Sequence, residues 1–562
     1  MAAITDPAAV ERATGAAARE APGKALVFIG FMGAGKTTTA LELAAWLGVT
    51  PLDSDRLLEK RLGRSIADEF ALNGEGAFRA KEEELVCELL AKAGPGDVIS
   101  LGGGSVLSKR VRAALKPHLT VLLDVAVDDA WERTIEASEA GGPITGESTE
   151  RPLAREREAF AVLYASRQEV YVGLADAILP VAPRSGFYRP VGSDGLGMAV
   201  RTLPALRALA AAAPRTRMLW ASAASGEYPV FVGRGLLRAG GAAALEQLWP
   251  LDLASSRRFC VTDEIVATLY GERLGKVGAL VSIPPGERHK TLRSAELVWH
   301  ELVAAGMTRA DHVVALGGGV VGDLAGFCAA TYQRGVPVVQ IPTTLVAQVD
   351  SAYGGKTGVD LPEAKNYVGA YHQPAGVLVD PDTLATLPAA ELDAGWVEVL
   401  KTALIAGGPL WERVAGGDEV QEDTILACAR TKLAIVAADE RDAGRRQALN
   451  LGHTVGHAIE TATGYARYRH GEAVGLGLLA ALRLSGLQDL RAQVRELLLA
   501  RGLPVTLGDA SGDVEQIVRA SARDKKRLGA HVPFVLLQAP GEVVTGRQVS
   551  AGELRSAVAE LI

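Results

Sequence analysis

Residues 25–38 read ALVFIGFMGAGKTT, and this stretch decides the fold of the first part of the chain. An apolar run ends at Gly30, and the eight residues from Gly30 to Thr37 match GxxxxGK[ST] at every position. Apolar side chains then recur at helical spacing over residues 37–48. A strand, a glycine-rich loop and a helix in this order predict a phosphate-binding loop. The alternative is a plain glycine turn, which does not need a lysine and a hydroxyl after its last glycine.

The residue types of this loop suit a nucleotide triphosphate. Glycines let backbone N–H groups curl around phosphates, and a helix N-terminus favours an anion. Lys36 neutralises charge on the transferring group, and Thr37 supplies a hydroxyl for Mg²⁺. We expect ATP and Mg²⁺ to bind here through Gly33, Ala34, Gly35, Lys36, Thr37 and Thr38.

The chain around this loop alternates between strand-like and helical patterns. Strand-like runs recur at 98–103 and 119–126, and this alternation predicts a parallel α/β sheet. The helical pattern of residues 201–213 closes the first unit. Residues 214–226 contain Pro and small residues without a clear period, so we expect a linker there.

A second unit begins at residue 227. Strand-like runs follow at 228–233, 258–263, 278–284, 311–319 and 336–342, and long helical patterns dominate after residue 388. We therefore predict an α/β fold class with a kinase-like domain at 22–213, a linker at 214–226, an α/β half at 227–388 and a mostly helical half at 389–562.

Residues that follow the phosphate loop in the sequence limit the range of substrates that the site could phosphorylate. In chain order these are the aspartates of LDSD (52–55), Phe78-Arg79 with Glu82, the triple glycine 102–104, and the arginine of YASRQEVY (164–171). In this order they resemble the shikimate kinase family, and the resemblance covers residues 22–213. It implies a P-loop kinase fold of the nucleoside monophosphate kinase type.

The resemblance implies a role for each of these residues. Asp55 would hold the shikimate hydroxyls and can act as base, while Asp53 assists Mg²⁺ through water. Arg79 and Arg167 would clamp the shikimate carboxylate, which suits bidentate guanidinium chemistry. Gly103 lets the backbone approach the ring. Phosphoryl transfer needs this combination of charge neutralisation and an oriented hydroxyl.

The lid of the kinase departs from the family pattern. Family lids carry two arginines a few residues apart, the second in an RPL signature. Arg151 supplies that signature, while the earlier arginine corresponds to Arg133. Between them lies an expanded polar stretch, 136–150, whose Gly, Ser and Thr content predicts a mobile loop. We expect Arg151 to contact ATP.

The second unit contains a further glycine-rich turn, LGGGVVGD at 316–323, after a strand-like run and before helical sequence. Such a turn can hold a dinucleotide pyrophosphate against backbone N–H groups, although the motif is not GxGxxG and is weak evidence alone. Lysines, arginines, acidic residues and histidines follow this turn at many positions of the second unit.

Three of these residues suggest a metal site. Glu398, His453 and His470 form a set of nitrogen and oxygen donors that leaves coordination positions open, as catalytic zinc requires. His453 and His457 are four residues apart and share one face of a helix. The pair His453 and His457 could equally bind the metal and leave His470 free.

The succession of motifs resembles the 3-dehydroquinate synthase family, and the match covers nearly all of 227–562. The resemblance implies that Glu398, His453 and His470 bind Zn²⁺ or Co²⁺. It implies that His457 acts as an acid or base or contacts the phosphate. It places NAD on Asp263, Glu287, Lys290, Gly318, Gly319, Asp323, Thr343, Thr344 and Lys365. It places the seven-carbon sugar-acid phosphate on Arg334, Asp350, Lys356, Asn366, Lys401, Lys432, Arg446, Asn450 and Lys526.

Lys356, Lys401, Asp442 and His457 are the residues that this resemblance assigns to catalysis. Asp442 departs from the family, which has glutamate four residues before the equivalent of Arg446. Aspartate keeps the carboxylate but shortens its reach by one methylene, so its role as proton acceptor is the weakest assignment. The implied reaction oxidises an alcohol with NAD, eliminates phosphate, reduces the ketone again and closes a carbocycle. NAD is regenerated in each turnover.

We therefore predict a fused enzyme of aromatic-precursor biosynthesis, with shikimate kinase followed by 3-dehydroquinate synthase. The two steps are not consecutive, so channelling between the sites is not implied. One alternative is a related sugar-phosphate cyclase or a metal-dependent polyol dehydrogenase in the C-terminal half. Another is a degenerate kinase half that acts only as a binding module.

Composition limits the partners of the 562-residue chain. Its net charge of −7 gives no global basic field, so we expect neither nucleic acid nor an anionic membrane as partner. No uncharged apolar run reaches the ~20 residues of a membrane span, and residues 1–22 lack the apolar core of a signal peptide. Four scattered cysteines favour a reducing cytoplasm. The synthase resemblance implies a homodimer through the C-terminal half.

Overall fold

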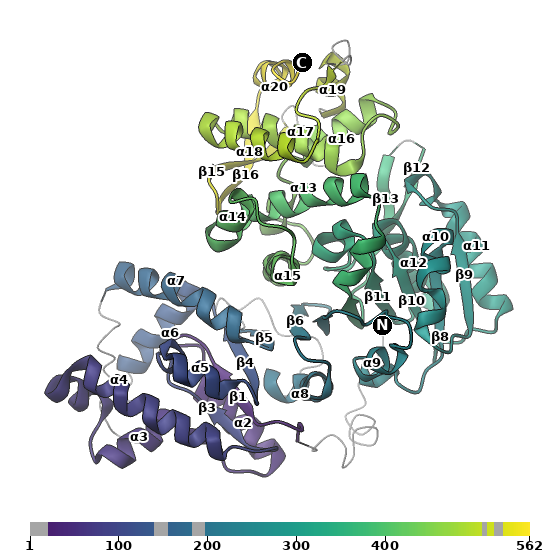
Figure 1. The fold of residues 1–562 in the computed structure, drawn as a ribbon. Coiled ribbons are helices and arrows are strands. Elements are labelled where there is room, and N and C mark those ends of the chain that lie inside the picture. Colours follow the sequence, from purple (N-terminus) through teal and green to yellow (C-terminus); the bar gives the residue numbers. More distant parts are fainter. Residues whose placement is uncertain (1–20, 140–155, 182–196, 363, 509–513, 522–531) are drawn as a thin grey trace. The chain divides into compact units, whose positions relative to one another are not determined.

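The computed structural model describes residues 21–139, 156–181, 197–362, 364–508, 514–521 and 532–562. The chain forms two compact units: Met1–Phe231 with Glu246–Asp252, and Val232–Leu245 with Leu253–Ile562 (Figure 1). None of the helices in the described ranges combines the length and the apolar character needed to cross a membrane.

The first unit contains a parallel sheet. Its strands lie in the order β2 (Leu52–Asp53), β3 (Val98–Ser100), β1 (Leu26–Ile29), β4 (Leu119–Asp124), β5 (Ala177–Pro180) and β6 (Arg217–Ala223). Leu26 of β1 pairs with Val98 on one side and with Leu119 on the other, and all four residues of β1 are buried. The loop after this central strand therefore opens at the carboxyl edge of the sheet, where α/β folds bind ligands.

Helices connect these strands. They are α2 (Lys36–Leu47), α3 (Ser54–Leu62), α4 (Ile66–Lys92), α5 (Lys109–Leu115), α6 (Val127–Glu139), α7 (Arg157–Leu174) and α8 (Met198–Ala211). The long helix α4 is kinked at Gly74, whose φ of 76° and ψ of 169° are not helical. The kink separates the start of α4 from the turns that carry Arg79 and Glu82.

The prediction of an irregular linker over 214–226 is wrong at the level of secondary structure. Residues Arg217–Ala223 form strand β6, which pairs in parallel with β5, and β7 (Gly226–Val232) follows it. Six of the seven residues of β6 are buried. A strand that is buried on both faces has no alternation of apolar and polar residues, so the two-residue period was absent from the sequence.

The second unit begins with an α/β half, as expected. Its parallel strands lie in the order β14 (Gly376–Val379), β11 (Val338–Pro342), β10 (His312–Gly317), β8 (Arg258–Asp263) and β9 (Ala279–Ile283). Helices α10 (Glu264–Tyr270), α11 (Leu292–Ala304) and α12 (Gly319–Thr331) accompany them, and α9 (Ala242–Gln247) precedes β8. A hairpin of β12 (Lys356–Leu361) and β13 (Ala364–Tyr371) packs on α12.

The rest of the second unit is mostly helical, which confirms the predicted texture after residue 388. It contains α13 (Ala389–Ala406), α14 (Gly408–Ala415), α15 (Glu422–Ala438), α16 (His453–Ala462), α17 (His470–Leu484), α18 (Gln488–Ala500), α19 (Val514–Ser521) and α20 (Ala551–Ala559). One antiparallel hairpin, β15 (Val532–Ala539) and β16 (Glu542–Val549), interrupts the helices. Helices α13, α16 and α17 pack together and bring distant parts of the sequence to one place.

Candidate active sites

The phosphate loop of the first unit has the backbone that its sequence predicts. Strand β1 ends at Ile29, and α2 begins at Lys36 directly after Gly35, which has a φ of 85°. Gly33 also has positive φ, and a Cβ there would lie 2.4 Å from the carbonyl oxygen of Ala130. Only glycine fits at this position. The N-terminus of α2 faces the loop and can bind an anion there.

Polar side chains surround this loop. The Lys36 ammonium donates hydrogen bonds to the carbonyl oxygens of Gly30 (3.0 Å) and Phe31 (3.1 Å). The Thr37 hydroxyl donates to Oδ2 of Asp53 at 2.7 Å. The other oxygen of Asp53 caps α3 by accepting from backbone N–H groups. The hydroxyl and the carboxylate that were predicted near Mg²⁺ are thus in direct contact, and an oxygen pair of this kind suits Mg²⁺.

A carboxylate and a guanidinium lie against the triple glycine. Added Cβ atoms show how close they come: one on Gly102 would lie 2.4 Å from Oδ1 of Asp55, and one on Gly104 would lie 2.1 Å from Nη1 of Arg79. Arg79 also donates to Oε2 of the buried Glu82 at 2.7 Å. The structure therefore brings Asp55, Arg79 and the glycines together, and a side chain at 102 or 104 would displace the Asp55 carboxylate or the Arg79 guanidinium.

Arg167 is also close to the triple glycine. Its guanidinium carbon lies 5.8 Å from the centre of the Phe31 ring, and its buried Nε has no hydrogen-bond partner among the described residues. One turn further along α7, the Tyr171 hydroxyl donates to the carbonyl oxygen of Gly103. Burial raises the pKa of Tyr171 to about 12, although the nearby positive charge of Arg167 opposes this shift. A buried guanidinium whose Nε has no hydrogen-bond partner among the described residues is suited to bind a carboxylate.

The second unit gathers a carboxylate and two histidines from three helices. Glu398 of α13 is fully buried, and its Oε1 accepts no hydrogen bond from the described residues. Nε2 of His453 lies 3.6 Å from this oxygen, and Nε2 of His470 lies 3.5 Å from it. An unsatisfied buried carboxylate oxygen facing two imidazole nitrogens fits a divalent metal ion with mixed N and O ligands.

His457 is close to the same cluster. The ligand atoms of His453, His457 and His470 all lie within 4.8 Å of one another, and the His457 side chain is exposed. The distances therefore also allow a metal ion to be bound by the three histidines alone. The position of Glu398 Oε1 between His453 and His470 favours the set that includes the carboxylate.

The protonation of this cluster depends on its charges. Burial would raise the pKa of Glu398, but the charges of Lys401 and the histidines hold it well below its usual range. Burial lowers the pKa of His453 to about 3, so this ring is neutral. Burial also disfavours the charged form of His470, but the carboxylates of Glu398 and Glu460, each 3.5 Å from one of its ring nitrogens, raise its pKa to about 9. Metal binding at His470 would release this proton.

Cationic side chains lie next to the carboxylate–histidine cluster. Lys401 is 2.6 Å from Oε2 of Glu398 and 3.3 Å from Oδ2 of Asp350, and Lys432 forms a second ion pair with Asp350. Burial would lower the pKa of Lys401, but Asp350 and Glu398 raise it above its usual value. Burial would raise the pKa of Asp350, but the two lysines lower it to about 2. Lys401 and Asp350 are therefore both charged.

Another lysine and an arginine extend this basic region. Lys356 pairs with Asp442 at 2.6 Å, so the shorter aspartate still reaches its partner. Burial lowers the pKa of Lys356, and the ion pair with Asp442 opposes the shift. The buried Arg446 donates to the Gly354 carbonyl oxygen at 2.9 Å, and a Cβ on Gly354 would lie 2.8 Å from its Nη2. Three buried cations, Lys401, Lys432 and Arg446, and the exposed Lys356 suit a substrate with two anionic groups.

The predicted dinucleotide residues lie at the carboxyl ends of strands. Gly318 caps α12 after β10, and a Cβ there would lie 2.8 Å from Thr344 Cγ2. Asp263 ends β8 and caps α10 by accepting from two backbone N–H groups. The buried Thr343 hydroxyl has no hydrogen-bond partner in the described part of the chain. Open backbone N–H groups at this edge fit a pyrophosphate.

The remaining predicted dinucleotide residues form a line of ion pairs. Lys290 is buried, 3.0 Å from Oε1 of Glu287 and 3.2 Å from Oδ2 of Asp323. Lys365 of the β12–β13 hairpin is 3.6 Å from Oε1 of the same Glu287. The carboxylates raise the pKa of Lys290 above its usual value, against the effect of burial.

Family comparisons agree with this geometry. The shikimate kinase family model matches residues 32–185, that of the 3-dehydroquinate synthase N-terminal part matches 280–394, and that of its C-terminal part matches 395–527. A 3-dehydroquinate synthase of Symbiobacterium thermophilum is 44% identical over 351 residues, which cover 58% of this chain and 96% of that relative. The chain belongs to the 3-dehydroquinate synthase family. Its N-terminal part is a shikimate kinase domain, so the protein is a bifunctional enzyme of the shikimate pathway.

Other similar proteins support the synthase fold. A 3-dehydroquinate synthase of Halorhodospira halophila is 43% identical over 351 residues, 59% of this chain and 96% of that relative. The structure of 2-epi-5-epi-valiolone synthase from Streptomyces hygroscopicus subsp. jinggangensis, with NAD⁺ and Zn²⁺ bound, is 28% identical with a TM-score of 0.54. It covers 60% of this chain and 97% of that structure.

Other predicted residues lie in turns and in the β12–β13 hairpin of the second unit, or outside the described residues. Arg334 lies in the turn after α12 with a φ of 70°, and its guanidinium has no hydrogen bond or ion pair within the described ranges. Asn450 lies three residues before His453, and its side-chain amide donates a hydrogen bond to the carbonyl oxygen of Gln447. Asn366 follows Lys365 in the hairpin with a φ of 51°. Lys526 of the synthase and Arg151 of the kinase lid lie outside the described residues.

Sequence reasoning missed two residues that contact the proposed sites. Tyr171 of the kinase supports the triple glycine, and it lies four residues after Arg167 on α7. Glu460 of the synthase contacts both Lys365 and His470, and it lies seven residues after His453 on α16. Helical spacing from a known site residue was the available signal in both cases.

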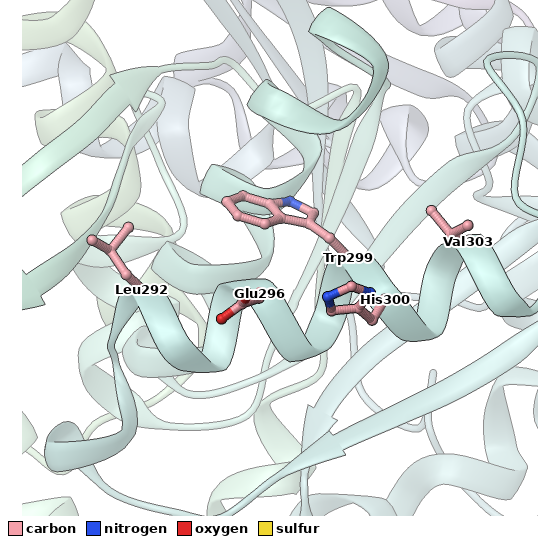
Figure 2. A pocket seen from close by; sticks show the side chains of 5 residues that line it. All are labelled: Leu292, Glu296, Trp299, His300 and Val303. Atoms are coloured by element: carbon pink, nitrogen blue, oxygen red, sulfur yellow. The ribbon is translucent and has the colours of Figure 1, made fainter.

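A hollow on α11 does not coincide with either site. It has a volume of about 490 Å³ and is lined by Leu292, Glu296, Trp299, His300 and Val303 (Figure 2). These residues recur at helical spacing along one helix, and none was predicted to bind substrate or cofactor. The active sites of the protein are therefore better located from their charged residues than from this hollow.

Proposed function

We propose that the N-terminal site transfers the γ-phosphoryl group of ATP to a hydroxyl of shikimate. The loop from Gly33 to Thr38 binds the phosphates, and Lys36 neutralises their developing charge. When ATP binds, the Lys36 ammonium exchanges its hydrogen bonds to the carbonyl oxygens of Gly30 and Phe31 for bonds to the phosphates. Mg²⁺ is held on the side of Thr37 and Asp53, whose hydrogen bond already joins the two groups.

Asp55 orients the shikimate hydroxyl and accepts its proton. Arg79 and Arg167 bind the carboxylate from two sides of the triple glycine, and Gly103 allows the ring to approach the backbone. The contact of Arg79 with Glu82 holds the guanidinium plane in place. The observation that carries this assignment is the placement of Asp55 and Arg79 against Gly102 and Gly104 next to a complete phosphate loop.

We propose that the C-terminal site converts 3-deoxy-D-arabino-heptulosonate 7-phosphate to 3-dehydroquinate and phosphate. The residues at the carboxyl ends of β8 and β10 would hold NAD, which would supply a reversible hydride acceptor with no net redox change. Zn²⁺ or Co²⁺ on Glu398, His453 and His470 supplies a Lewis acid for alcohol and carbonyl oxygens. The fit of this metal rests on the unsatisfied Glu398 oxygen between two imidazole nitrogens.

The remaining residues bind the substrate and move its protons. Lys356, Lys401, Lys432 and Arg446 neutralise the phosphate and carboxylate, and Asp350 orients two of the lysines. His457, exposed beside the metal ligands, is placed to donate or accept a proton near the phosphate. Asp442 is the proton acceptor next to Lys356.

A substrate panel tests the synthase assignment. The purified full-length protein, loaded with Co²⁺ and NAD, is assayed with the heptulosonate phosphate and with neutral heptulose phosphates. We expect phosphate release only from the acid, because the buried lysines and arginine match its carboxylate. Turnover of a neutral sugar phosphate alone would instead assign the site to another sugar-phosphate cyclase, the class of the valiolone synthase that shares the fold.

Assembly, location and domain boundaries complete the proposal. We propose a homodimer through the synthase part, which sedimentation of the full-length protein tests directly. A reducing cytoplasm suits the four cysteines, which are all free thiols. The kinase domain spans residues 22–213, and the synthase spans 227–562 with its halves divided at 388 and 389.

A further inference from the structure

Glu460 is a buried carboxylate in the second unit that the proposed reaction does not use. It lies on α16 at the third position of a helical series, with His453 and His457 at the first and second. Its Oε1 is 3.0 Å from Nζ of Lys365 and 3.5 Å from Nδ1 of His470. A single oxygen thus contacts a residue of the proposed metal site and a residue of the proposed NAD site.

The contact with His470 is of a kind that positions metal ligands. Nε2 of His470 faces Glu398, while Nδ1 faces Glu460. A carboxylate on Nδ1 accepts the N–H of the neutral ring and leaves the lone pair of Nε2 for the metal. Glu460 therefore sets both the tautomer and the orientation of the ring.

Lys365, the second partner of Glu460, has further contacts with residues outside the proposed metal site. Lys365 lies 4.7 Å from the centre of the Tyr465 ring and 3.6 Å from Oε1 of Glu287, so its ammonium is held from several sides. Glu287 in turn pairs with Lys290. Charges of alternating sign therefore run from the metal ligand His470 to the group of residues proposed for NAD.

Burial makes these contacts necessary for Glu460. Only 3% of its side chain is exposed, and a buried charge is tolerated when it is paired. Glu460 meets this need with two partners, because its Oε1 is in contact with both Lys365 and His470.

We propose that Glu460 is a positioning residue for both cofactors, which orients His470 for the metal and Lys365 for NAD. The inference rests on the proposed roles of His470 and Lys365. It predicts that one substitution weakens the binding of two unrelated ligands. Carboxylates that orient metal-bound histidines typically change metal affinity by about 10–100-fold when they are replaced.

The test measures binding of each cofactor rather than turnover. Full-length Glu460→Gln is titrated with Co²⁺, followed by visible absorption and by competition with a chelator, and with NAD by calorimetry. We expect the affinity for Co²⁺ to fall about 10–100-fold with a changed absorption spectrum. We expect the affinity for NAD to fall about fivefold or more, because Lys365 loses its partner.

Two further variants separate the two contacts. Lys365→Met should lower the affinity for NAD and leave that for Co²⁺ within about threefold. Glu391→Gln is the matched control: it removes an exposed carboxylate that pairs with Arg469, next to His470, and should change neither affinity. The double variant Glu460→Gln/Lys365→Met removes the buried carboxylate and its half-buried partner together, which protects folding if the single variant is unstable. It should bind Co²⁺ as weakly as Glu460→Gln and NAD no more weakly than Lys365→Met.

The outcomes distinguish this inference from the proposed function. Loss of Co²⁺ binding in Glu398→Gln, with unchanged binding of both ligands in Glu460→Gln, keeps the metal site and overturns the role of Glu460. Loss of only one affinity in Glu460→Gln also overturns it, since the residue would then serve a single cofactor. Unchanged Co²⁺ binding in Glu398→Gln would overturn the metal site itself.

Discussion

The kinase site and the synthase site differ in how they hold their charged residues. In the kinase, Lys36, Asp53 and Asp55 are half-buried and lie on a backbone that glycines shape. In the synthase, Glu398 and Lys401 are 0% and 1% exposed, and each carries a partner from another segment of the chain. The first site is built mainly from one local motif, whereas the second is built from ion pairs between distant segments. Removal of one charged side chain should therefore abolish activity in the kinase without unfolding it. In the synthase the same kind of change should lower both the activity and the stability.

The largest contrast is expected from removal of the metal. A zinc-selective chelator in the presence of excess Mg²⁺ should abolish formation of 3-dehydroquinate, because Glu398, His453 and His470 would lose their ion. Shikimate-dependent ADP formation should stay unchanged. Both rates are measured on the same preparation, and Co²⁺ should restore the synthase. A synthase rate that survives complete metal removal would contradict the role given to these residues.

The next contrast uses Lys401→Met. This change leaves the buried carboxylates of Glu398 and Asp350 without one shared cation, which costs about 3–5 kcal/mol. We expect loss of synthase activity and a lower temperature for unfolding of the second unit, with kinase activity retained. Calorimetry and the two assays measure these effects. Glu391→Gln, on the same helix, is the control. An unchanged unfolding temperature would show that the buried network is not a source of stability.

Arg79→Lys should change the kinase without unfolding it. Lysine keeps the positive charge but cannot bind a carboxylate in bidentate fashion, and the loss of a charge-assisted hydrogen bond costs about 1.5–3 kcal/mol. The KM for shikimate should rise about 10–100-fold, while the KM for ATP stays unchanged. Steady-state kinetics with each substrate varied in turn decide the point. An effect confined to ATP would place Arg79 outside the shikimate site.

The smallest effect is expected from Tyr171→Phe. The variant removes one hydrogen bond to the Gly103 carbonyl oxygen and leaves the ring in the core. A neutral hydrogen bond contributes about 0.5–1.5 kcal/mol, so the KM for shikimate should rise about 2–10-fold. The same kinetic assay measures it, with synthase activity as internal control. A change in ATP affinity alone would mean that Tyr171 does not support the shikimate site.

The difference between the sites also explains what the sequence could predict. The phosphate loop is contiguous, so its strand, glycines and helix followed from residues 25–48 alone. Glu398 and His470 are 72 positions apart and meet only because α13, α16 and α17 pack together. Spacing left the choice between Glu398 and His457 open, and the family resemblance was needed to assign it. The geometry favours Glu398 through its unsatisfied oxygen.

Residues without a motif were the ones that sequence reasoning missed. Tyr171 and Glu460 are single polar residues on amphipathic helices, where a surface or core role is the ordinary interpretation. Strand β6 was missed because burial on both faces removes the two-residue period. Arg334 was placed at the substrate by resemblance alone, and its role there stays a prediction.

The most direct test of the account measures both activities of one full-length preparation before and after the change Asp55→Asn. We predict shikimate-dependent ADP formation with Mg-ATP in the unchanged protein and its loss in Asp55→Asn, with 3-dehydroquinate formation equal in both. Absence of shikimate-dependent turnover in the unchanged protein, with an active synthase, would contradict the claim that the first unit is a working shikimate kinase.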